Sequence, residues 1–267
     1  MNAPYAMILG ARGSVPISDP ACARYGGATT CVLLCLDGKY FVLDAGTGIL
    51  RLPQEVLEQP SLTLLLTHAH LDHINGLAMC PYVMRHGKVL DIYASLSDGQ
   101  PVDDVLRSLY SPPVWPILPE HFAAELRYHP LPADMNLGSV QISSIEGVHP
   151  GGVKLMRLCG SGKTVVFATD CTLTDSFLPE AAEFAQNCDL LICDGQYSEE
   201  EWAHRSGFGH NTWNRVADFG KLCHAKEVRI VHHDPTHSDA MLDAAAEEIL
   251  AISPSYRFAY EGEVIRL

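Results

Sequence analysis

Three histidines and an aspartate lie close together between a short apolar run and a segment that can begin a helix. They are His68, His70, Asp72 and His73. Residues 61–66 before them are typical of a strand, so the four side chains come from a strand-to-helix turn, which projects several groups into one small volume. Imidazole and carboxylate are ligands that zinc prefers. The run predicts a metal site more strongly than a polar turn whose histidines bond locally.

The number of donors predicts a pair of ions rather than one. Zinc takes its ligands at about 2.0–2.2 Å in a near-tetrahedral shell, and four donors from one short turn rarely converge on a single ion. We therefore expect two divalent metal ions, zinc in the first place, with manganese or iron as alternatives. Further ligands must come from other parts of the chain.

Three later polar sites each follow an apolar run of strand type. His149 follows residues 140–146, Asp170 follows 164–168, and a pair of histidines follows 228–231. Loops after strands gather at one edge of a sheet, so these side chains can meet the first four. Each alone would be an ordinary loop or turn residue. The expected shells are His68, His70 and His149 for one ion and Asp72, His73 and His233 for the other, with Asp170 joining them through its two oxygens.

Composition limits the class of protein. The 267 residues are 47% hydrophobic and 19% charged, which suits one large globular domain. No apolar run approaches the roughly 20 residues of a membrane span, and the N-terminus lacks a secretory pattern, so we expect a cytoplasmic protein without a membrane partner. The nine cysteines are expected to be free thiols. The net charge of −14 and the missing basic stripe argue against a long nucleic acid.

Hydrophobic periodicity predicts strands that alternate with helices, and hence an α/β fold of sheets covered by helices. Strands are expected at 6–9, 31–36, 40–43, 61–66, 90–94, 125–129, 140–146, 153–158, 164–168, 190–193, 228–231, 257–260 and 264–266. Helices are expected at about 48–57, from 75 onward, and at 100–109, 179–186, 212–224 and 238–250. The stretch 100–119 ends in a proline-rich part and is expected to form an active-site flap, or else a surface loop packed by its own side chains.

The order of these polar residues resembles the pattern of the metallo-β-lactamase superfamily, over nearly the whole chain. The matching positions are Asp44, the run 68–73, His149, Asp170 and His233. The resemblance implies a single domain over residues 1–267, folded as an αββα sandwich of two mixed β-sheets flanked by helices. It places a dinuclear metal centre at one edge. The family's last histidine follows a strand-end residue, which favours His233 as the ligand, although the adjacent His232 stays open.

Two residues outside the metal run narrow the class. His210 stands in a Gly-His-Asn-Thr stretch that resembles the Gly-His-Ser-Thr motif of tRNase Z and related phosphodiesterases. In those relatives this histidine protonates the leaving oxygen and is oriented by an acidic residue, whose position Asp194 occupies here. The alternative for His210 is an exposed side chain beside a helix cap at Asn211 or Thr212. Residues 68–77 also resemble the start of the class II cyclic-nucleotide phosphodiesterase signature.

The resemblance thus implies a phosphodiesterase in which a metal-activated hydroxide attacks a small phosphodiester. The substrate expected first among these is a cyclic nucleotide. Asp72, Asp194 and His210 are the expected catalytic residues. A lactonase or thioester hydrolase on the same fold is the runner-up. A tRNA 3′-processing endonuclease is a further alternative, which the acidic chain and the missing basic arm disfavour. A homodimer is expected because dimers are common among the relatives.

Overall fold

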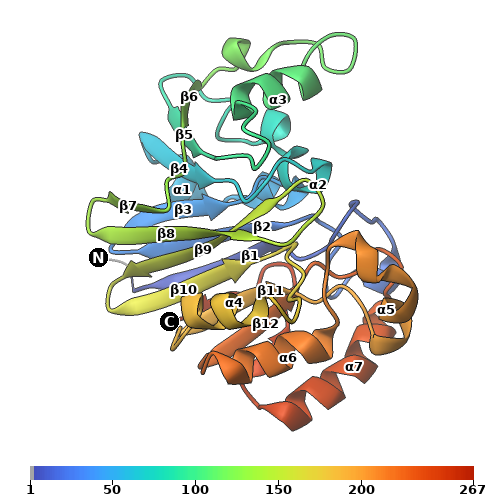
Figure 1. Ribbon diagram of the computed structural model, residues 1–267. Helices are drawn as coiled ribbons and strands as arrows, with labels where there is room; N and C mark the ends of the chain where they lie inside the picture. Colours follow the sequence, from blue (N-terminus) through green and yellow to red (C-terminus); the bar gives the residue numbers. More distant parts are fainter. Residues whose placement is uncertain (1–2) are drawn as a thin grey trace.

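Two seven-stranded β-sheets lie face to face in the computed structural model, which describes residues 3–267 (Figure 1). The first sheet has the order β14 (Val264–Arg266), β1 (Tyr5–Gly10), β2 (Cys31–Leu36), β3 (Lys39–Leu43), β4 (Ser61–Leu65), β5 (Val89–Tyr93) and β6 (Glu125–His129). The second has the order β13 (Tyr256–Phe258), β12 (Glu227–Val231), β11 (Leu190–Asp194), β10 (Lys163–Ala168), β9 (Val153–Gly160), β8 (Val140–Gly147) and β7 (Asp134–Leu137). Both sheets are mixed.

Helices cover the outer face of each sheet. The α-helices are α1 (Gln54–Leu57), α2 (Leu71–Ile74), α3 (Val102–Leu109), α4 (Leu178–Phe184), α5 (Glu199–Arg205), α6 (Trp213–Leu222) and α7 (Asp239–Ile252). Single 3₁₀ turns are η1 (Pro20–Cys22), η2 (Thr47–Arg51), η3 (Leu77–Met79), η4 (Pro119–His121) and η5 (Ser206–Phe208). The expected sandwich of two mixed sheets flanked by helices is therefore confirmed.

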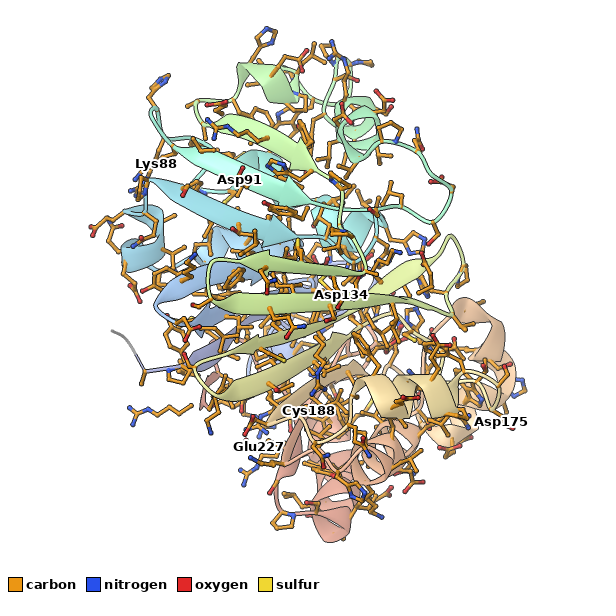
Figure 2. The ribbon with its side chains drawn as sticks, turned by 60° about the vertical axis from the view of Figure 1, so that its left-hand side comes forward. Lys88, Asp91, Asp134, Asp175, Cys188 and Glu227 are labelled. Atoms are coloured by element: carbon orange, nitrogen blue, oxygen red, sulfur yellow. The ribbon has the colours of Figure 1, made fainter. Side chains whose placement is uncertain are left out.

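Alternation along the strands explains the layers, because successive side chains of a strand point to opposite faces. In β3, Phe41 joins the core between the sheets, while Val42 packs under the helices of the first sheet. In β11, Ile192 faces the other sheet and Leu191 faces α6 and α7. Charged side chains such as Asp134 and Asp175 lie on the exposed surface (Figure 2). The sequence buries both faces of each sheet, as a sandwich requires.

The strand directions bring several loops to one edge of the sandwich. β3 and β4 run parallel in the first sheet, and β10, β11 and β12 run parallel in the second. Loops at the carboxyl ends of neighbouring parallel strands lie side by side. Short bridges from Arg12 to Thr29 and to His233 join the two sets of loops. In Figure 1, α2 and α5 mark this edge, on the side away from the two termini.

Several elements differ from expectation. The helix expected from Asn75 onward is absent from the described residues: the four-residue α2 ends at Ile74, and only the 3₁₀ turn η3 follows. Pro53 divides the helix expected over 48–57 into η2 and α1, because proline lacks the N–H that a continuing helix needs. Strand β7 and helix α5 were not predicted. The nine cysteines are free thiols, as expected. Within residues 3–267, none of the helices has the length and apolar character needed to cross a bilayer.

The expected flap is a packed segment at the far edge of the first sheet. It begins with α3, and Tyr110 after it is buried, its ring meeting Trp115 and Phe122 edge to face at 5.7 and 6.2 Å. The Tyr110 hydroxyl donates to the carbonyl of Ile74, just behind the ligand turn. The segment is thus anchored next to the predicted site by its own aromatic residues. Its role as a flap stays a prediction.

Candidate metal centre

The first cluster joins the ligand turn after β4 to the loops after β8 and β10. His68, His70 and His149 have ring centroids 4.5 to 5.1 Å apart. The Oδ2 atom of Asp170 lies 3.8 Å from Nε2 of both His68 and His149. Potential ligand atoms of all four residues lie within 4.8 Å of one another. The structure brings together the three histidines expected for one ion.

The second cluster joins α2 to the loops after β10 and β12. It contains Asp72, His73, Asp170 and His232, all buried. Nε2 of His232 lies 3.0 Å from Oδ2 of Asp72, and Nε2 of His73 lies 3.4 Å from the same oxygen. Burial alone would raise the pKa of Asp72, but His73 and His232 outweigh it and hold that pKa below its usual range. The carboxylate is therefore charged at neutral pH.

Asp170 lies between the clusters, and its two oxygens face different ones. Oδ2 faces the first cluster, whereas Oδ1 lies 3.2 Å from Nε2 of both His73 and His232 in the second. The hydroxyl of Thr169 donates to Oδ1 at 2.7 Å. Asp170 itself has a left-handed φ of 53°. A carboxylate in this position can share its oxygens between two ions, as its place after a strand predicts.

The two clusters fit divalent metal ions. Nε2 of His68 and Nε2 of His73 are buried without a hydrogen-bond partner, and an unpaired buried polar atom costs roughly 1–3 kcal/mol. Burial, with His73 nearby, lowers the pKa of His68 well below its usual value, so that this imidazole is neutral, the form that binds metal. Each of these two unpaired nitrogens lies close to other imidazole and carboxylate groups, which are the ligands that zinc prefers.

Buried hydrogen bonds fix the orientation of the ligand rings. Oδ2 of Asp44 accepts from Nδ1 of His73 at 2.8 Å, and the other oxygen accepts from the backbone N–H of Thr67 at 2.8 Å. Nδ1 of His149 donates to the carbonyl of Gly209 at 3.0 Å. A ligand histidine held through its second nitrogen presents the first one to the metal in a fixed tautomer. Asp44, the early acidic residue, is thus a positioning group.

Gln196 performs the same task for His232 and was not predicted. Its buried side-chain oxygen lies 3.2 Å from Nδ1 of His232, and its amide nitrogen lies 3.3 Å from Oγ of Ser14. The backbone N–H of Ser14 in turn donates to Oδ2 of Asp72 at 2.7 Å. Gln196 therefore links His232 to Asp72 by way of Ser14. These residues come from separate loops, so no local sequence pattern signals the link.

We expect Gln196→Ala to weaken metal binding at the second cluster by about 10–100-fold, the usual effect of removing an outer partner of a ligand histidine. The first cluster, which Gln196 does not contact, should keep its affinity. Titration of the apoprotein with metal, together with the number of ions bound when metal is limiting, measures the affinities of both clusters. The exposed Gln141→Ala is the matched control. An unchanged affinity at both clusters would show that His232 does not need this support.

The choice of His233 as the last ligand is wrong in the structure, where His232 occupies the second cluster. Nε2 of His233 donates to the carbonyl of Ala259 at 2.8 Å, and its ring packs edge-on against Tyr25 and Phe258. Burial lowers the pKa of His233 to about 3, so the ring is a neutral core side chain. His232 has a left-handed φ of 64°, which turns its side chain toward Asp72 and Asp170.

His210 and Asp194 form a buried pair beside the second cluster. Nδ1 of His210 donates to Oδ2 of Asp194 at 2.7 Å, and the His210 ring stacks on His232 with centroids 4.8 Å apart and planes 23° apart. Thr212 does cap α6 by accepting from the N–H of Arg215, as the capping alternative expects, but His210 is buried and bonded to Asp194 rather than exposed. The pairing of His210 with Asp194 leaves Nε2 as the nitrogen that can exchange a proton with a ligand.

One family model and several known proteins are similar to this chain. A model of the beta-lactamase superfamily domain matches residues 39–233. The probable metallo-hydrolase YhfI from Bacillus subtilis (strain 168) is 23% identical over 274 residues, which cover 96% of this chain and 98% of that protein. The crystal structure of the B. subtilis protein superposes with a TM-score of 0.72 at 19% identity, covering 98% of this chain and 99% of that one.

Two further solved structures share the whole fold. A diphosphatase from the PhnP family has a TM-score of 0.72 at 16% identity and covers 99% of this chain and 98% of its own. The short form of human tRNase Z has a TM-score of 0.67 at 16% identity and covers 98% of each chain. At these identities the similarity establishes the fold and not the substrate.

Proposed function

This chain belongs to the metallo-β-lactamase superfamily and is a metal-dependent hydrolase, and we propose that it cleaves a small phosphodiester. The preferred candidate substrate is a cyclic nucleotide. The proposal includes two divalent ions, most simply zinc, held by His68, His70, His149 and Asp170 on one side and by Asp72, His73, His232 and Asp170 on the other. When bound, such ions stabilise negative charge on a phosphoryl group and lower the pKa of water.

The pair of His210 and Asp194 is the observation that favours a phosphodiester. Hydrolysis of an alkyl phosphodiester expels a poorly leaving alkoxide, which benefits from a proton donor at the departing oxygen. His210 can donate from Nε2, while Asp194 stabilises the protonated ring through Nδ1 at 2.7 Å. Its stacking on His232 holds it within reach of a group bound at the second cluster. An acid in this position has a clear task in phosphodiester cleavage.

The charge around the centre supports a small substrate. The potential ligands of the two clusters are histidines and carboxylates, and the pocket beside His70 has no Lys or Arg among its described lining residues. A long nucleic acid needs a series of basic contacts to its phosphates, whereas a single phosphodiester can be neutralised by the metal site alone. On this ground we propose a small phosphodiester as the substrate. We also propose a homodimer, the state expected from the relatives.

A substrate panel tests this function. Purified protein with a measured metal content is assayed on a 2′,3′-cyclic nucleotide, a 3′,5′-cyclic nucleotide, an acyl-homoserine lactone, a thioester and a tRNA precursor. We expect turnover of a cyclic nucleotide with kcat/KM above about 10⁴ M⁻¹s⁻¹, the lower end of the usual enzyme range. Preferential hydrolysis of the lactone or the thioester would establish the runner-up, and cleavage of the tRNA precursor would establish the endonuclease.

A further inference from the structure

A hollow of about 230 Å³ adjoins the first cluster on the side of His70. Its walls come from the ligand turn and from the segment between β5 and α3. The lining residues that matter here are His68, His70, Ser97, Asp98, Gln100 and Gly152. Pockets for whole drug-sized ligands measure roughly 300–1,000 Å³. This hollow is smaller, so it fits one substituent of a ligand whose reacting group lies at the metal centre.

Two glycines of the loop after β8 form part of the wall of the hollow. Gly152 has a φ of +82°, and a Cβ atom there would lie 2.0 Å from Oγ of Ser97. Gly151 has a φ of +83°, and its Cβ would lie 3.5 Å from Nε2 of His70. A side chain at either position would strain the backbone, and at Gly152 it would also collide with the opposite wall. The loop after β8 therefore packs closely against Ser97 at Gly152, whereas the missing side chain at Gly151 leaves the space beside Nε2 of His70 free.

Asp98 is the one carboxylate among the described residues that line the hollow, and Ser97 and Gln100 add polar side chains. Asp98 is exposed at its edge, where one carboxylate oxygen accepts from the N–H of Gln100 at 2.9 Å. Ser97 donates its hydroxyl proton to Glu146 at 2.9 Å. The ammonium of Lys154 is paired with the same Glu146 carboxylate. Of the described residues that line the hollow, none is a lysine or arginine that could balance a second anionic group.

We propose that this hollow is the subsite for an uncharged, hydrogen-bonding substituent of the phosphodiester, such as a nucleoside ring, and that Asp98 excludes substituents that carry further phosphate. This inference rests on the proposed phosphodiesterase function. The reacting phosphodiester would meet the metal-binding side of His68 and His70, whereas a second phosphate in the hollow would meet Asp98 without a compensating cation. The substrate class is therefore a mononucleoside phosphodiester rather than an oligonucleotide or a polyphosphate.

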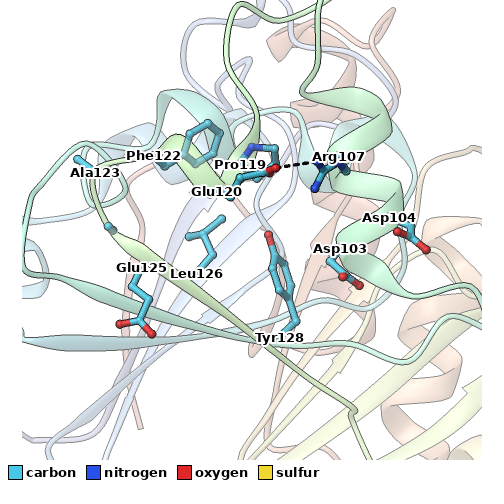
Figure 3. A pocket seen from close by; sticks show the side chains of 11 residues that line it. Asp103, Asp104, Arg107, Pro119, Glu120, Phe122, Ala123, Glu125, Leu126 and Tyr128 are labelled. Carbon is cyan, nitrogen blue, oxygen red and sulfur yellow. Dashed lines mark ion pairs between the residues drawn. The ribbon is translucent and has the colours of Figure 1, made fainter.

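A larger hollow of about 510 Å³ lies between α3 and β6 and supplies a matched control (Figure 3). Asp103 and Asp104 line it, and an ion pair of 2.8 Å joins Arg107 to Glu120 across it. Its described lining residues include none of the metal-centre residues. Asp104 carries the same charge as Asp98 and lines this other hollow, and it is not among the described residues that line the subsite, so its neutralisation should leave the subsite unchanged.

Two substrates with the same leaving group test the proposal. They are thymidine 5′-(p-nitrophenyl phosphate) and its 3′-phosphorylated counterpart, which differ only by the extra phosphate. For the wild-type holoenzyme at low ionic strength, we expect kcat/KM to favour the uncharged nucleoside by at least about 10-fold. Asp98→Asn should reduce this ratio by about 3–10-fold, and Gln100→Lys should reduce it further. Asp104→Asn should leave it unchanged. The effect of Asp98→Asn should shrink in high salt, which screens exposed charges.

The outcomes separate the subsite from the proposed function. No turnover of either substrate by metal-loaded protein would refute the phosphodiesterase function itself. Equal kcat/KM values for the two substrates, or a ratio that Asp98→Asn leaves unmoved, would overturn the subsite while the function stands. A ratio that Asp104→Asn moves as much as Asp98→Asn would also overturn it, because a general field of the protein would then be responsible.

Discussion

His210→Ala should lower kcat on a cyclic nucleotide by about 10²–10⁴-fold while the protein keeps its full metal content. The reason is that His210, held by Asp194 at 2.7 Å, is the group placed to protonate a departing alkoxide. A p-nitrophenolate leaving group needs no such proton, so the same variant should lose less than about 10-fold on bis-p-nitrophenyl phosphate. Steady-state kinetics on the two substrates, with metal analysis of each preparation, measures the difference.

His204→Ala, an exposed histidine on α5, is the matched control and should behave as wild type on both substrates. Asp194→Asn should reproduce part of the His210→Ala loss on the cyclic nucleotide, because an amide stabilises the charged ring less well. Equal losses by His210→Ala on both leaving groups would point to a structural role in the second cluster, where the ring stacks on His232. Full activity on the cyclic nucleotide would exclude the general-acid role.

Asp170→Asn should remove both bound metal and activity. The two carboxylate oxygens face different clusters, 3.2 Å from His73 and His232 on one side and 3.8 Å from His68 and His149 on the other. An amide offers one neutral oxygen in place of two charged ones. We expect a loss of metal affinity of more than about 100-fold, beyond the range found for outer partners, and turnover at background. Metal analysis after gel filtration and assays with added zinc measure both.

Asp175→Asn is the control for this change, since the Asp175 side chain is 98% exposed and its ion-pair partner, Arg215, belongs to neither cluster. It should keep metal and activity. Retention of two ions per chain by Asp170→Asn would show that Asp170 does not bridge them. Retention of one ion would assign Asp170 mainly to the cluster that is lost.

The layers of the fold and most of the site could be predicted because they depend on local patterns. Alternation in β3 and β11 marks buried faces, and the ligand turn lies in one continuous run. Helix α5 was missed although its start is signalled, since Ser198 and Glu201 form a capping box at three-residue spacing. The Ser-x-x-Glu spacing is a helix signal that the sequence itself carries.

The last ligand could not be predicted, because His232 and His233 are adjacent and both follow a strand. His232 has left-handed backbone, which turns its ring toward the cluster, while the ring of His233 faces the core. Three residues at this edge, Asp44, Asp170 and His232, have left-handed φ values of 59°, 53° and 64°. This conformation costs roughly 1–3 kcal/mol for a non-glycine residue, and it is imposed by tertiary contacts that the sequence does not display.

The metal content of the purified protein, measured together with its hydrolysis of a 2′,3′-cyclic nucleotide, tests the central claim most directly. We expect two divalent ions per chain and a turnover that disappears on chelation and returns with added zinc or manganese. Protein that carries both ions, is inert on cyclic nucleotides and on bis-p-nitrophenyl phosphate, and hydrolyses a lactone or a thioester would contradict it.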